Sequence, residues 1–261
     1  MAMPSQAHAR QEFVILTHVR SGSSLLADLL ARNGIGDAEE HLNQRALAKC
    51  GRSWDPAQVL AQARARDHCE FFGSKVMVHW LDDLKRHAGA PAATDAQILG
   101  RLFAPGFTTI YLYRADTVAA AVSFTLAELS GRWHQVGGQA VAHSAGDGLH
   151  LPRWAALGPL ISDNVAWLDS CKDRLRAVSA ALAPRAAELC YEDLARDMAA
   201  ELRRAAAFIP GTGDRQLTAV SGHRKLADAR SDELCRQWRA EHPGYAPAGY
   251  PAQARSQGTP G

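Results

Sequence analysis

Phe13-Val-Ile-Leu-Thr-His-Val-Arg-Ser-Gly-Ser-Ser-Leu-Leu-Ala-Asp-Leu-Leu30 is the stretch that decides the fold of this 261-residue chain. It opens with the apolar run Phe13 to Leu16, which is rich in strand-forming residues and predicts a short buried strand. It closes with leucines at positions 25, 26, 29 and 30, the three- and four-residue spacing of a helix. A buried strand that leads directly into a helix predicts an α/β fold.

The segment Arg20-Ser-Gly-Ser-Ser24 lies between that strand and that helix. A strand that passes through a small-residue turn into a helix leaves backbone N–H groups at the positive end of the helix dipole, which suits an anion. Arg20 adds a planar charge that matches phosphate or sulfate oxygens, and the hydroxyls of Ser23 and Ser24 can donate to the same group. The alternative is an ordinary turn capped by serine.

The Walker pattern of nucleoside triphosphatases is absent from this segment, because no Gly-Lys-Ser/Thr follows its glycine. The segment therefore favours a ligand that needs less charge neutralisation than a γ-phosphate, and no magnesium site is expected.

Composition limits the class of protein. With 47% hydrophobic residues the chain can bury one core, and we expect a single domain over residues 12–240 between disordered ends at 1–11 and 241–261. A net charge of +2 is too small to favour nucleic acid as a partner. The five cysteines are scattered, with no CxxC pair, so they indicate a reducing compartment rather than zinc or disulfides. No segment approaches ~18 uninterrupted apolar residues, so we expect no membrane insertion and a cytoplasmic location.

Three further strands are expected at Phe71–Trp80, Thr108–Tyr113 and Ala187–Tyr191. Arg114 then stands at the C-terminal end of a strand, where open α/β sheets bind ligands, and Ser123 on the following helix can face the same region. Besides the first helix, to Asn33, the apolar spacing predicts a helix pair within Arg45–Arg66 and helices at Leu81–His87, Arg114–Glu128, Pro159–Ala183, Glu192–Phe208 and Ser231–Arg239.

Two features outside these patterns carry possible chemistry. The loop Gly34–Asn43 contains Glu39, Glu40 and His41 where a substrate beside a bound anion could meet them, although a solvated loop or a helix start would look the same. Lys75 is unusual inside an apolar strand, because lysines are rarely buried unless they are paired. It either lines the ligand site or pairs with an acid for structural reasons.

Several segments, in order along the chain, resemble PAPS-dependent sulfotransferases. Val19-Arg-Ser-Gly-Ser-Ser-Leu-Leu26 is similar to their 5′-phosphosulfate loop. Tyr113-Arg114-Ala-Asp116, with Ser123 nine residues after Arg114, is similar to their 3′-phosphate motif. Tyr191-Glu-Asp-Leu194 and Arg224-Lys-Leu-Ala-Asp228 resemble later elements of the same proteins. The strand Phe72–Met77 and the loop Gly36–Asn43 narrow the resemblance to the bacterial Stf0-type family, which includes trehalose 2-sulfotransferase, and the likeness covers most of Phe13–Arg239.

The resemblance implies a three-layer, P-loop-like α/β fold with a central, mainly parallel sheet flanked by helices. It implies a homodimer that transfers a sulfuryl group from PAPS without a metal, leaving PAP. Arg20 and the loop Ser21, Gly22, Ser23 and Ser24 would hold the 5′-phosphosulfate. Arg114 and Ser123 would hold the 3′-phosphate, and Arg224 or Lys225 would close over the nucleotide.

The resemblance also implies a glutamate general base in the loop after the first helix. Glu40 matches it if the loop has lost one residue, since Ala38 stands where a proline is common. Without that gap His41 falls at the base position, and of the two we favour Glu40. The base would take the proton of an acceptor hydroxyl as it attacks the sulfur in line.

The acceptor is expected to be a small molecule or a glycan. Lys75, His79, Trp80 and Trp133 are candidates for its pocket, because aromatic faces beside polar groups suit a sugar ring. Two other classes remain open: a P-loop kinase for a small hydroxylated substrate, and a catalytically silent PAP-binding protein on the same scaffold.

Overall fold

The fold is that of a computed structural model, which describes residues 10–49, 54–131, 133, 152–213, 215–222 and 229–247. Within these residues four strands form one sheet in the order β2-β1-β3-β4, and all three pairings are parallel. The strands are β1 (Gln11–Thr17), β2 (Phe71–Met77), β3 (Thr108–Tyr113) and β4 (Ala186–Cys190). The parallel sheet expected from the sequence is confirmed.

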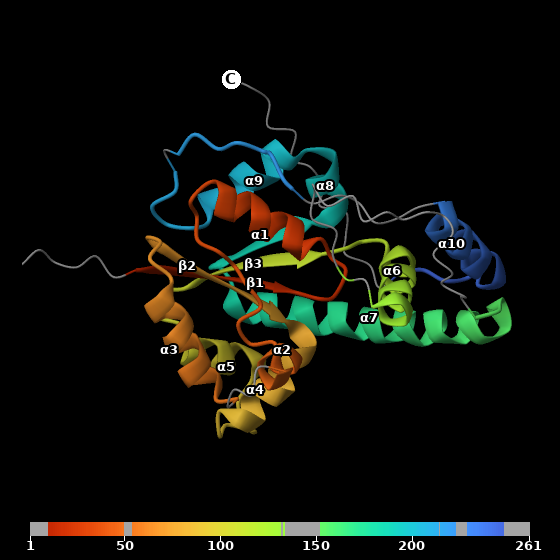
Figure 1. The fold of residues 1–261 in the computed structure, drawn as a ribbon, viewed down its shortest axis with the longest axis horizontal. Helices are drawn as coiled ribbons and strands as arrows, with labels where there is room; N and C mark the ends of the chain where they lie inside the picture. The colour runs from red at the N-terminus through yellow and green to blue at the C-terminus, as the bar shows by residue number, and fades with distance from the viewer. Residues whose placement is uncertain are drawn as a thin grey trace, which may run out of the picture.

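Helices cover both faces of this sheet (Figure 1). They are α1 (Ser23–Arg32), α2 (Gln44–Lys49), α3 (Pro56–Arg66), α4 (Leu81–His87), α5 (Asp95–Leu102), α6 (Thr117–Ser130), α7 (Trp154–Leu182), α8 (Tyr191–Arg196), α9 (Met198–Ala207) and α10 (Ala229–Glu241), with a 3-10 turn at Val78–Trp80.

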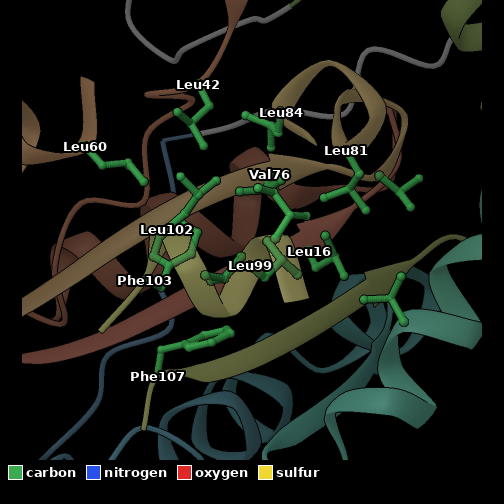
Figure 2. Close-up of a cluster of buried hydrophobic side chains, with 14 of the residues drawn as sticks. Leu16, Leu42, Leu60, Val76, Leu81, Leu84, Leu99, Leu102, Phe103 and Phe107 are labelled. Atoms are coloured by element: carbon green, nitrogen blue, oxygen red, sulfur yellow. The ribbon is translucent and has the colours of Figure 1, made fainter. Parts of the chain in front are cut away.

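Alternation along the strands sends side chains to the two faces. Phe13 and Ile15 of β1 face one helical layer, where they join Leu26, Leu30 and other buried residues of α1 and α9. The opposite face of the sheet is covered by α3, α4, α5 and the C-terminal half of α7. Figure 2 shows the core of that layer, whose labelled residues are Leu16, Leu42, Leu60, Val76, Leu81, Leu84, Leu99, Leu102, Phe103 and Phe107. The two clusters make the protein a three-layer α/β structure.

A third apolar cluster lies beyond the sheet. The N-terminal half of α7 extends past the strand ends and packs against α6 and α10 (Figure 1). Ile161, Val165 and Leu168 of α7 meet Val122 of α6 and Trp238 of α10 in this cluster. We call α6, α10 and this half of α7 the arm.

Three local features differ from expectation. The single helix expected over Glu192–Phe208 is two helices, because Asp197 ends α8 and its carboxylate accepts the Ala200 N–H that opens α9. Helix α5 was not expected at all, although Thr94 and Gln97 form a capping box at its start. At the C-terminal end, Tyr245 donates a hydrogen bond to Asp169 and packs on Trp238, beyond the domain boundary expected at residue 240.

Candidate active site

The loop between β1 and α1 opens the site, at the C-terminal edge of the sheet. Arg20 and Gly22 both have left-handed backbone conformations, with φ of 58° and 85°. Arg20 is the one non-glycine residue in the described chain with positive φ, a strained state that is frequent at functional sites. No described side chain caps the start of α1, so its first N–H groups are available to an anion.

Gly22 meets a second requirement besides its φ. A Cβ built on it would lie 2.3 Å from Cδ2 of Tyr191, the first residue of α8. The loop therefore rests directly on an aromatic ring that belongs to the edge beyond β4. Any side chain at position 22 would push the loop off this support.

Two guanidinium groups face the cavity beside the loop. Burial, and then the positive charge of Arg114, lower the pKa of Arg20. The side chain of Arg114 is only 13% exposed, its guanidinium carbon lies 4.9 Å from the centre of the Tyr191 ring, and its Nε has no hydrogen-bond partner in the described structure. Two half-buried cations that repel each other, one with an unpartnered N–H, suit an anionic ligand.

Neighbouring side chains orient these arginines. Arg20 Nε donates to Ser123 Oγ at 2.8 Å, and the same guanidinium donates to the carbonyl of Trp133. The Glu192 carboxylate accepts the N–H groups of Ala115 and Asp116 at 2.9 and 3.1 Å. The chain beyond Arg114 is thereby fixed to the start of α8.

His18 ties the end of β1 to the end of β3. It is fully buried, its Nε2 accepts the Arg114 N–H at 3.1 Å, and its Nδ1 lies 2.8 Å from the Val19 carbonyl. Burial lowers the pKa of His18 to about 4, so the ring is neutral at pH 7. Because one ring nitrogen accepts, the proton resides on Nδ1 and is donated to Val19.

A cavity of about 960 Å³ joins these groups to a carboxylate. Its walls include Arg20, Ser23, Ser24, Arg114, Ser123 and Glu40. His41 is not among the wall residues: it stacks on Phe72, and its Nε2 lies 3.3 Å from the Gly73 carbonyl. Of the two base candidates, Glu40 is the one that lines the cavity.

The sequence left two roles open for Lys75, lining the ligand site or pairing with an acid, and in the structure it pairs with an acid. Its Nζ lies 3.1 Å from Oε1 of Glu40 and donates to Ser24 Oγ at 3.0 Å. Lys75 is not itself a wall residue of the cavity, so it supports the site from behind the anion loop.

The other end of the cavity is aromatic. The expected residues His79, Trp80 and Trp133 line it. Sequence reasoning did not identify Trp54, Phe124 and Trp167, which line it as well. Tyr191, which supports the anion loop, is also a wall residue of the cavity. Trp54 Nε1 and His79 Nδ1 are buried without a hydrogen-bond partner in the described structure, and burial lowers the pKa of His79 to about 4.

The family of this chain follows from its similarity to known proteins. The sequence model of the family described as Stf0 sulphotransferase matches residues 12–241. This chain belongs to the Stf0 sulphotransferase family. A comparison with curated proteins gives no match.

The fold has a counterpart among solved structures. A sulfotransferase from Alicyclobacillus acidocaldarius matches with a TM-score of 0.52 and 14% identity, over 89% of this chain and 92% of that one. At that identity the likeness concerns the fold alone. Together with the family match it makes the three-layer α/β structure a sulfotransferase fold.

Some of the residues expected in the site of this Stf0 sulphotransferase do not line the cavity or lie outside the described residues. Ser21 is fully buried, and its hydroxyl lies 2.5 Å from Thr17 Oγ1, so its side chain faces the protein rather than the cavity. Arg224 and Lys225 lie outside the described residues. Within the described part of the chain no three His, Cys, Asp or Glu side chains are placed to share a metal ion, and no helix is long and apolar enough to span a membrane.

Proposed function

We propose that this Stf0-family protein transfers a sulfuryl group from PAPS to a hydroxyl of a carbohydrate acceptor, with Glu40 as general base. The observation that carries the proposal is the placement of two mutually repelling guanidiniums and one carboxylate in a single cavity. PAPS has two separate anionic groups, and a hydroxyl acceptor needs a base, so the three charges match the three requirements.

The donor would be held at two places. Arg20, the N–H groups at the start of α1 and the hydroxyls of Ser23 and Ser24 would bind the 5′-phosphosulfate. Arg114, whose Nε is buried without a partner, would bind the 3′-phosphate together with Ser123. When bound, PAPS supplies the sulfuryl group that is transferred.

Each protein group then has one task. Glu40 takes the proton of the acceptor hydroxyl as that oxygen forms its bond to sulfur. Arg20 and the loop N–H groups stabilise the negative charge that grows on the departing phosphate oxygen. None of these tasks needs a metal ion.

The acceptor end would suit a sugar ring. Its tryptophans and Phe124 offer flat apolar faces, and His79 adds a polar ring beside them. At pH 7 the imidazole of His79 is neutral, because burial lowers its pKa to about 4, so it can donate or accept without adding charge.

Calorimetric titration with PAP, adenosine 5′-phosphate and magnesium-ATP tests the donor assignment. We expect PAP to bind at least tenfold more tightly than adenosine 5′-phosphate, because only PAP carries the 3′-phosphate. Equal affinity for the two would refute the donor assignment, and strong binding of magnesium-ATP would favour a kinase.

Glu40→Gln tests the base. We expect PAP release from PAPS, in the presence of a panel of mono- and disaccharides, to fall by about 10²–10⁴-fold, while PAP binds no more weakly than to the wild type. Glu39→Gln is the matched control, because this exposed neighbour is not a wall residue of the cavity. Unchanged turnover in the Glu40 variant would exclude it as the base.

A further inference from the structure

Lys75 is placed beside Glu40 by the backbone. The N–H of Lys75 donates to the Glu39 carbonyl at 2.9 Å, and Glu39 forms a parallel bridge with Ser74. The loop after α1 thus runs for one residue as an addition to β2. The next residue along that loop, Glu40, is carried next to the lysine side chain.

The ammonium of Lys75 connects the base to the anion loop. It lies 3.1 Å from Glu40 Oε1 and donates to Ser24 Oγ at 3.0 Å, on a side chain that is only 7% exposed. The other oxygen of Glu40, Oε2, accepts from Asn43 Nδ2 at 2.8 Å. The buried ammonium of Lys75 therefore contacts both the Glu40 carboxylate and the anion loop.

An anion at the loop would compete with Glu40 for this cation. Ser24 is in the second position of α1, where the N–H groups and hydroxyls converge on the expected binding place. Among the described residues, the charged and titratable groups around Glu40 include Lys75 from β2 and His79 from the 3-10 turn. Arg45 of α2, Asp83 of α4 and Arg174 of α7 act on His79 electrostatically. His79 is neutral at pH 7 and adds no charge there, whereas the ammonium of Lys75 is in direct contact with the carboxylate.

We propose that Lys75 is a positioning residue that couples donor binding to the basicity of Glu40. The inference rests on the proposed function. Without donor, Lys75 and Asn43 hold the Glu40 carboxylate as a weak base. A bound anion draws the ammonium toward Ser24, the ion pair weakens, and Glu40 becomes a stronger base for the acceptor hydroxyl. The acceptor proton then moves to Glu40, while the ammonium keeps its own protons.

Thermodynamic linkage makes this coupling measurable in a binding experiment that needs no catalytic turnover. If the carboxylate and the anion compete for one ammonium, removing the carboxylate must tighten anion binding, and it must do so through Lys75. The relevant quantity is the PAP dissociation constant in four proteins: the wild type, Glu40→Gln, Lys75→Met and the double variant.

Calorimetry with PAP decides the matter. We expect Glu40→Gln to tighten PAP binding about fivefold or more, a usual size for coupling between sites. Lys75→Met should weaken it, and adding Glu40→Gln to Lys75→Met should change it by less than about twofold. Lys75→Arg, which keeps the cation, should restore the response to Glu40→Gln, as a merely structural role would not.

Two controls protect the conclusion. Glu39→Gln removes a negative charge one residue away and should leave PAP affinity within about twofold, because its side chain does not contact Lys75. Thermal melting checks that each variant folds, and Lys75→Gln, an uncharged side chain that can still donate to both oxygens, replaces Lys75→Met if that variant does not fold.

The failures can be told apart. If Glu40→Gln tightens PAP binding equally with and without Lys75, or not at all, the coupling is refuted while the donor assignment stands. If the wild-type protein shows no preference for PAP over adenosine 5′-phosphate, the proposed function fails, and this inference fails with it.

Discussion

At the scale of the residue, Arg114 is a cation with an incomplete set of partners. Its Nε lies 3.9 Å from Oε1 of Glu192, but the oxygens of that carboxylate already accept two backbone N–H groups. The ring of Tyr191 beneath the guanidinium contributes a weaker attraction. Arg114 therefore keeps unmet hydrogen-bonding capacity at the cavity wall.

Arg114→Ala should weaken PAP binding tenfold or more and leave the affinity for adenosine 5′-phosphate nearly unchanged, since only PAP presents a 3′-phosphate to this residue. Calorimetry with both ligands measures the two effects. Arg236→Ala, at an exposed site on α10, is the control for loss of one positive charge. Equal losses for the two ligands would assign Arg114 to some other part of the donor.

The sequence could predict the residues of the anion loop better than the partners of individual side chains. Arg20 and Arg114 line one cavity, because the C-terminal ends of parallel strands share one edge, and Glu40 lines the same cavity from the loop after α1. The partner of Lys75 could not be predicted, because it depends on the bridge that brings Glu39 beside Ser74. Trp54 and Trp167 had no local signal either, since they reach the cavity from just before α3 and from the middle of α7.

At the scale of the element, strands and helices with a clear apolar stripe were predictable because their spacing is local. The break at Asp197 was not, because the apolar pattern continues across it while the aspartate caps the second helix. Helix α5 is short, and its capping box was a better signal than its periodicity.

Gly22→Ala should distort the turn from β1 into α1, which depends on the backbone conformation of Gly22 and on the ring of Tyr191. Gly22 has φ 85° and its added Cβ would collide with Tyr191, whereas Gly106 has φ 91° and open space around it. Gly106→Ala should cost only the left-handed strain of about 1–2 kcal/mol. Gly22→Ala should cost about 1–3 kcal/mol more from overpacking, and should also abolish PAP binding. Urea unfolding of the two variants separates the cost of the left-handed backbone from the cost of the collision with Tyr191, and calorimetry measures PAP binding. Equal losses of stability would show that the Tyr191 ring moves aside without cost.

At the scale of the whole molecule, buried histidine makes stability depend on pH. His18 has a pKa of about 4 when folded, against 6.5 for the free side chain, so the unfolded chain binds its proton first as the pH falls. The stabilisation is complete above pH 6.5 and is lost progressively between about 6.5 and 4. His79 acts in the same direction, because burial also lowers its pKa to about 4.

Urea unfolding at pH 7 and pH 5 tests this. The wild type should lose about 2 kcal/mol of stability through His18 between these values. His18→Gln should be less stable at pH 7 but show a correspondingly smaller loss at pH 5, while His68→Gln, at an exposed site, should behave as the wild type does. An unchanged pH dependence in His18→Gln would mean that this ring is not the group that titrates.

Helix α7 has a consequence for how the protein could be re-engineered. Its C-terminal half packs in the sheet core through Leu175 and Val178, and its N-terminal half is part of the arm. At 29 residues it is a rod of about 43 Å. Phe124 and Trp167, two of the aromatic walls, stand on the arm, whereas the anion loop belongs to the sheet edge. Ser123, which orients Arg20, also stands on the arm. Transplanting the arm surfaces around Phe124 and Trp167 between relatives, with Ser123 kept in place, is therefore a route to new acceptor preferences on an unaltered donor site.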